Sequence, residues 1–63
     1  MVREIIKEGL GIVVFKNKEE NTYGYMLDDT ILMNNLPPLC RPMLIKSFNE
    51  LYKIREKESN NND

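Results

Sequence analysis

The spacing of hydrophobic residues changes once along the chain. Up to residue 33 these residues come in short runs rich in β-branched and aromatic side chains, of which residues 10–16 (LGIVVFK) are the clearest. Runs of this kind, bounded by polar turns, predict β-strands. Residues 22–27 (TYGYML) follow the polar loop NKEEN, and a connection of about five residues fits an antiparallel hairpin.

Two further strands complete the predicted sheet. Asp28 and Asp29 predict a turn, because short carboxylate side chains hydrogen-bond their own backbone, and residues 30–33 (TILM) follow as a strand. Residues 2–7 (VREIIK), ended by Gly9, predict another strand, although apolar and polar residues alternate imperfectly there. The chain therefore begins as an antiparallel sheet of three to four strands.

The second half of the chain has helical spacing. Residues 34–42 (NNLPPLCRP) contain prolines that exclude regular strand pairing and predict an extended crossover. Pro42 suits the first position of a helix. Beyond it, apolar positions recur on one side of a helical wheel: Leu44, Ile45, Phe48, Leu51, Tyr52 and the stem of Arg55. We therefore expect an α+β fold, with one C-terminal helix packed on the sheet.

The ends of the helix are less well defined than its apolar side. Ser47 followed by Glu50 matches a capping box, so a helix start near Ser47 is an alternative. The apolar positions cross Ser47 without a change of phase, which favours one continuous helix. Residues 58–63 (ESNNND) have no apolar anchor and predict a disordered tail after a single domain of residues 1–57.

Both faces of the predicted sheet carry apolar side chains. In the strand of residues 10–16, Ile12 and Val14 point to one side while Val13 and Phe15 point to the other. One helix covers one face, and soluble monomers rarely leave an apolar patch of several hundred Å² exposed. We therefore expect a second copy to cover the other face. The expected interface residues are Val13, Phe15 and Met26 on the sheet, with Met43 and Ile54 on the edge of the helix.

The small size of the chain also favours self-association. A chain of 63 residues buries only roughly 60% of its unfolded surface, and small proteins supplement their cores with disulfides, metals or oligomerisation. Cys40 is the only cysteine and histidine is absent, which excludes an intrachain disulfide and a Cys/His zinc site. We expect a homodimer or a higher assembly that holds no metal and no other cofactor.

Charge and composition argue against most catalytic chemistry. Nine basic and ten acidic residues give a net charge of −1, which predicts no long-range attraction to polyanions. Cys40 lacks the histidine that usually activates a nucleophilic thiol. Asp28 and Asp29 could offer oxygen ligands to magnesium, but a turn is the better interpretation of an isolated pair. We expect no enzymatic activity, and the free cysteine and charged N-terminus predict a cytoplasmic protein.

The function that these features favour is that of an interaction protein. We expect a small cytoplasmic homo-oligomer that binds and modulates a larger partner, for instance a phage-encoded inhibitor of a host enzyme or defence system. In that hypothesis four acids would face a basic site on the partner, since charge complementarity speeds association and selects partners. These acids are Glu19, Glu20, Asp28 and Asp29.

A single-stranded nucleic-acid-binding sheet protein is the alternative. Tyr23 and Tyr25 would stack on bases, and the basic side chains of the crossover and helix would contact phosphates: Arg41, Lys46, Lys53 and Lys57. The order of four strands and a helix is similar to that of small single-strand-binding transcription cofactors, a likeness of topology without a matching motif. A third hypothesis is a magnesium-dependent nuclease that uses Asp28 and Asp29.

Overall fold

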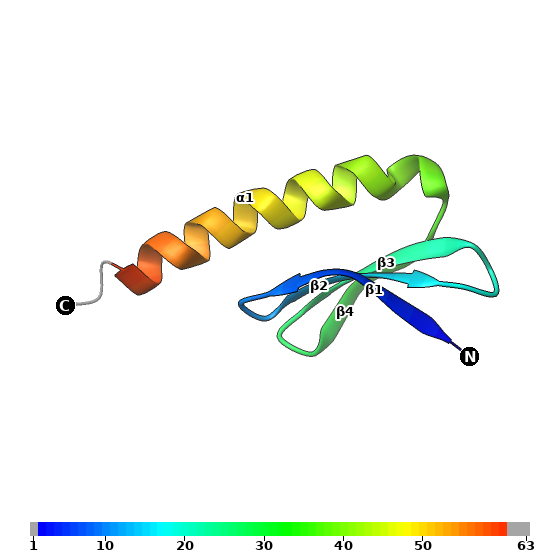
Figure 1. Cartoon of the computed structure of the whole chain (residues 1–63), viewed down its shortest axis with the longest axis horizontal. Helices are drawn as coiled ribbons and strands as arrows, with labels where there is room; N and C mark the ends of the chain where they lie inside the picture. The colour runs from blue at the N-terminus through cyan, green and yellow to red at the C-terminus, as the bar shows by residue number, and fades with distance from the viewer. Residues whose placement is uncertain (1, 61–63) are drawn as a thin grey trace.

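The computed structural model describes residues 2–60 and consists of a four-stranded sheet followed by a helix (Figure 1). The strands are β1 (Arg3–Gly9), β2 (Ile12–Asn17), β3 (Thr22–Leu27) and β4 (Thr30–Leu36). They form one antiparallel sheet in the order β1-β2-β3-β4. A short 3₁₀ segment, η1 (Pro38–Cys40), leads into helix α1 (Arg41–Asn60). The predicted α+β fold is confirmed.

Two tight turns at one end of the sheet use left-handed backbone. Asp28 and Asp29, with φ of 50° and 68°, connect β3 to β4 as predicted, and Leu10 and Gly11, with φ of 51° and 81°, connect β1 to β2. Two-residue turns with positive φ at both positions match the twist of antiparallel strands. The predicted start of the second strand at residue 10 is therefore wrong, because Leu10 reverses the chain.

Strand β4 and helix α1 are both longer than predicted. β4 continues to Leu36, and its register against β3 shifts twice on the way. α1 runs through Ser47 without a break, which confirms the continuous helix. Residues 58–60, expected in the tail, belong to α1, and the rest of the expected tail, residues 61–63, lies outside the described residues.

The hydrophobic core lies between α1 and one face of the sheet, with the helix placed over β2 (Figure 1). Its buried residues come from three elements: Ile12 and Val14 on β2, Tyr23 and Tyr25 on β3, Leu44 and Phe48 on α1. Gly9 of β1 lets the helix approach, since a Cβ atom there would lie 2.7 Å from the ring of Tyr52. The tyrosine face of the sheet therefore meets the helix of its own chain.

The opposite face of the sheet buries Phe15 without a covering helix. Phe15 pairs with Gly24 of β3, and a Cβ atom on Gly24 would lie 2.2 Å from Cζ of the ring. The guanidinium carbon of Arg3 lies 4.7 Å from the ring centroid, a distance typical of cation–π contact. The side chain of Phe15, expected at an interface between copies, is instead fully buried within its own chain.

Candidate interaction surfaces

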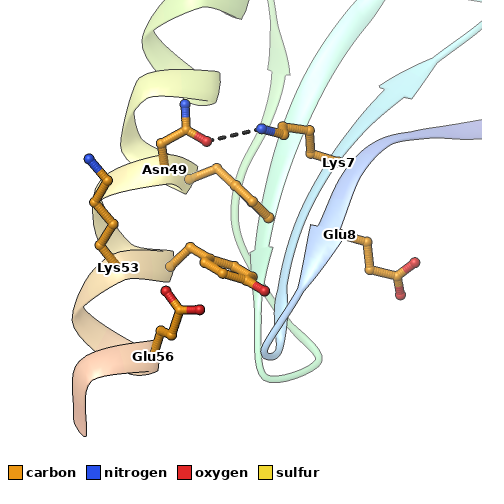
Figure 2. A pocket seen from close by; sticks show the side chains of 7 residues that line it. Lys7, Glu8, Asn49, Lys53 and Glu56 are labelled. Carbon is orange, nitrogen blue, oxygen red and sulfur yellow. Dashed lines mark hydrogen bonds between the residues drawn. The ribbon is translucent and has the colours of Figure 1, made fainter. Parts of the chain in front are cut away.

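A groove of about 520 Å³ lies between β1 and α1 (Figure 2). Phe48 and Tyr52 line it, with ring centroids 5.7 Å apart and ring planes inclined by 26°. Because these residues are four positions apart, their rings fall on the same side of the helix. The groove therefore has a wall of two stacked aromatic rings.

Charged side chains of both signs surround these rings. The register of β1 shifts between Ile5 and Lys7, and Ile6 and Lys7 both contact the helical side of the sheet as a result. Lys7 Nζ donates a hydrogen bond of 3.0 Å to Asn49 Oδ1 and lies 5.2 Å from the centroid of Phe48 (Figure 2). The remaining charged residues of the groove are Glu8 on β1 and Lys53 and Glu56 on α1. Such a groove suits an apolar or aromatic group that is flanked by polar atoms.

Arg55 fastens α1 to the two tight turns at one end of the sheet. Its Nη1 donates to the carbonyl oxygen of Leu10 at 2.7 Å and to Asp28 Oδ1 at 3.0 Å, while Nη2 donates to Asp28 Oδ2 at 2.8 Å. Gly11 leaves room for this pair, since a Cβ atom there would lie 2.5 Å from Asp28 Oδ1. Hydrogen bonds from Arg55 lower the pKa of Asp28 below its usual range. The carboxylate of Asp28 is therefore engaged in a structural contact.

A second pocket, of about 450 Å³, brings Glu8 close to the predicted acidic pair. Glu8, Asp28 and Asp29 line it together with the Leu10–Gly11 turn. Carboxylate oxygens are the ligands that a magnesium ion prefers. Over residues 2–60, however, no three acidic or cysteine side chains are grouped closely enough to hold a metal ion. The pocket therefore gives no support to the magnesium-dependent hypothesis.

The four acids predicted to face a partner do not form one surface. Glu19 and Glu20 lie in the turn between β2 and β3, whereas Asp28 and Asp29 lie in the turn between β3 and β4. These turns are at opposite ends of β3, roughly 17 Å apart for a strand of this length. Glu19 and Glu20 are exposed. The structure thus brings the acids together only as two separate pairs.

The residues of the nucleic-acid alternative are also separated. Tyr23 and Tyr25 are only 7% and 3% exposed, beneath α1, so their ring faces are not accessible to bases. The basic residues Arg41, Lys46, Lys53 and Lys57 are all exposed on the helix. The predicted stacking surface is therefore absent from the folded chain, because the helix covers that face of the sheet.

The remaining predicted interface residues lie in two different places, the sheet face away from α1 and the helix α1. Val13 and Met26 are half-buried neighbours on the face away from α1, paired across β2 and β3. Met43 and Ile54 are exposed on α1. Cys40 ends η1 as a partly exposed free cysteine.

The sequence analysis missed the most exposed apolar segment of the sheet. Ile31, Leu32 and Met33 follow one another on β4 and are 42%, 52% and 39% exposed. Their strand contains no charged residue (TILMNNL), whereas β1 at the other edge (REIIKEG) contains four. That difference in charge is the sequence signal that could have identified β4 as an unprotected edge.

No protein-family model, curated protein or solved structure matches the chain. No helix within residues 2–60 is long and apolar enough to cross a lipid bilayer.

Proposed function

We propose that the protein is a self-associating interaction protein that binds and modulates a larger macromolecular partner through its surface. The observation that carries this proposal is the exposed run Ile31, Leu32 and Met33. Singly exposed hydrophobic residues are normal in folded proteins, but contiguous ones mark sites of contact with other chains.

The flank of α1 nearest to β3 also carries exposed apolar side chains. Met43 and Ile54 are 56% and 54% exposed and fall within about 20° of each other on a helical wheel. Ser47 lies in the same sector, and its hydroxyl donates to the hydroxyl of Tyr25 on β3 at 3.4 Å. This flank therefore lies on the side of α1 that is nearer to β3 than to β1.

Two further features support binding to a larger partner. The groove between β1 and α1 presents Tyr52, a residue type enriched at the energetically important positions of protein interfaces. The exposed pair Glu19 and Glu20 lies in the turn between β2 and β3. We predict that these two acids face basic residues of the partner. An inhibitor of a host enzyme or defence system, encoded by a phage and acting in the cytoplasm, is the kind of protein that this proposal describes.

Self-association is the part of the proposal that can be tested first. Sedimentation velocity of the wild-type chain from about 5 μM to 1 mM should show a mass that rises with concentration, as mass action requires. A monomer at every concentration would contradict the proposal. In the same samples, a gel shift with single-stranded DNA at low salt should show no retardation. Retardation that weakens steeply with added salt would favour the nucleic-acid alternative.

A further inference from the structure

The charged residues of the groove between β1 and α1 are separated by sign along its length (Figure 2). Lys7 and Asn49, joined by a hydrogen bond, lie at one end, and the side chain of Lys53 extends back towards that end (Figure 2). Glu56 lies about 10 Å further along the helix axis than Asn49, at a rise of about 1.5 Å per residue. Glu8, the next residue on β1, lies on the rim of the same half as Glu56 (Figure 2). The groove therefore has a positive end and a negative end.

These charges do not neutralise one another. Within residues 2–60, neither lysine of the groove forms an ion pair with either glutamate. All four charged side chains belong to exposed residues. Both ends of the groove are therefore available to opposite charges on a ligand.

Between its two ends the groove is aromatic. Phe48 is only 5% exposed and forms the floor, whereas Tyr52 is half-buried and stacks on it. An aromatic ring from a ligand would pack against the part of Tyr52 that its own chain leaves uncovered. The groove volume of about 520 Å³ falls within the range of about 300–1,000 Å³ that is usual for ligand sites.

We propose that this groove binds an extended segment of the larger partner in which an acidic, an aromatic and a basic residue occupy alternate positions. The inference rests on the proposed function and names the chemistry of the partner segment. Alternate residues of an extended chain share one face and lie about 6.6 Å apart, so three of them span about 13 Å and reach both ends of the groove. The acidic residue pairs with Lys7 and Lys53. The aromatic ring packs on Tyr52, and the basic residue pairs with Glu56.

The mixed charge of the groove disfavours ligands of a single sign. A nucleic-acid strand or a wholly acidic segment would bring negative charge against Glu8 and Glu56. A wholly basic segment would bring positive charge against Lys7 and Lys53. Because like charges in an interface suppress wrong partners, the groove selects a segment that carries one charge of each sign.

Three short peptides test this selection. The probe is acetyl-Glu-Ser-Trp-Ser-Lys-amide, and two controls carry glutamate at both charged positions or lysine at both. In NMR titrations of the isotope-labelled chain, the probe should shift the backbone amide signals around the groove, those of Lys7, Asn49 and Lys53 among them. Each control should bind at least about threefold more weakly, because repulsion between like charges replaces one ion pair. Equal binding of the three peptides would contradict the proposal.

A charge reversal inside the groove has a matched control outside it. Lys53→Glu should weaken binding of the probe by about threefold or more and make the two-lysine peptide the best ligand of the three. Lys18→Glu makes the same change of net charge in the exposed turn between β2 and β3, away from the groove, and should leave the order of the peptides unchanged. Circular dichroism verifies that both variants are folded. An unchanged preference in Lys53→Glu would overturn the assigned contact.

The outcomes separate this inference from the proposed function. A chain that self-associates in sedimentation velocity, but whose groove signals do not respond to the probe, would overturn the groove inference alone. A chain that is monomeric at every concentration, but binds the probe with the expected selectivity, would contradict self-association and support the groove inference. Shifts centred on β4 instead of the groove would place the binding site elsewhere and overturn the inference.

Discussion

The two faces of the sheet exclude water from aromatic side chains by different means. On the face under α1, the rings of Tyr23 and Tyr25 are covered by helical residues such as Leu44 and Phe48, at least 19 positions later in the chain. On the other face, Phe15 is covered by Gly24 and Arg3 of its neighbouring strands. The first face depends on docking of a separate element, and the second depends only on strand pairing. A sheet face without a helix can therefore still bury its central aromatic residue.

This difference changes where a second copy is expected to bind. Apolar residues on both faces of the strands suggest that one face meets another chain, but the centre of that face is already occupied by Phe15. The exposed large hydrophobic residues of the sheet strands lie on its two edge strands, with Ile5 on β1 and Ile31, Leu32 and Met33 on β4. Exposed apolar side chains of this sheet therefore lie at its edge strands more than at the centre of its faces. The following variants test the comparison between the two faces.

The largest effect is expected on the helical face. Phe48→Ala removes a buried ring that joins α1 to the sheet, and such truncations cost about 3–5 kcal/mol. Because a domain of this size has little stability to lose, we expect the variant to be largely unfolded. Urea denaturation followed by circular dichroism measures the loss. Ile54→Ala, an exposed position on the same helix, should change stability by less than about 0.5 kcal/mol; a large loss there would contradict the assigned faces.

The next effect is expected on the face away from α1. Gly24→Ala places a methyl group where the ring of Phe15 lies, and overpacking of this kind costs about 1–3 kcal/mol. Replacing the ring by a smaller side chain should relieve the clash. A double-mutant cycle of Gly24→Ala with Phe15→Leu should therefore show strong coupling in denaturation experiments. Additive effects would mean that Phe15 does not lie against Gly24.

A smaller effect is expected from the cation that covers Phe15. Arg3→Ala removes the exposed guanidinium above the ring, a contact worth about 0.5–1 kcal/mol at an exposed site. Arg3→Lys keeps the positive charge and should recover part of the loss. The free energy of unfolding of the three proteins at one pH provides the measurement. If the change in Arg3→Ala is also seen in a Phe15→Leu background, the contact with the ring is not its cause.

The smallest effect is expected at the ion pair that holds α1 to the turns. Since Arg55 lowers the pKa of Asp28, the contribution of this pair is complete above the usual carboxyl pKa and is lost as the pH falls through the lowered value. The stability difference between wild type and Asp28→Asn should therefore shrink on acidification from neutral pH. Thermal melts at several pH values measure it. Asp29→Asn is the matched control in the same turn, and an equal pH dependence for both variants would rule out the contribution of Asp28.

Much of the fold was predictable because it depends on local spacing. The helical period beyond Pro42 predicted α1 and correctly excluded a break at Ser47. The Asp28–Asp29 turn was predicted from the preference of aspartate for local backbone hydrogen bonds. The start of β2 was missed because Leu10 is an apolar residue in a left-handed turn, a conformation that its side chain does not signal.

The candidate surfaces were less predictable, because they depend on contacts between distant residues. Asp28 was expected to face a basic site on a partner, but Arg55, 27 positions later in the same chain, binds it. Glu19 and Asp28 are near in sequence, yet strand β3 separates them. Lys7 reaches the groove beside Asn49 only because a register shift in β1 redirects its side chain. None of these three arrangements can be predicted from the spacing of residues along the sequence.

The sequence by itself determined the elements of this protein: four strands, a crossover and a helix whose apolar side must be covered. It also determined that β4 has no charged residue and β1 has several. Only the tertiary structure decided which face the helix covers. Both faces of the strands are apolar, so the alternation of side chains along each strand does not distinguish them. Gly9 admits Tyr52 on one side and Gly24 admits Phe15 on the other. With these close approaches, the tyrosines lie under the helix and Phe15 lies on the other face.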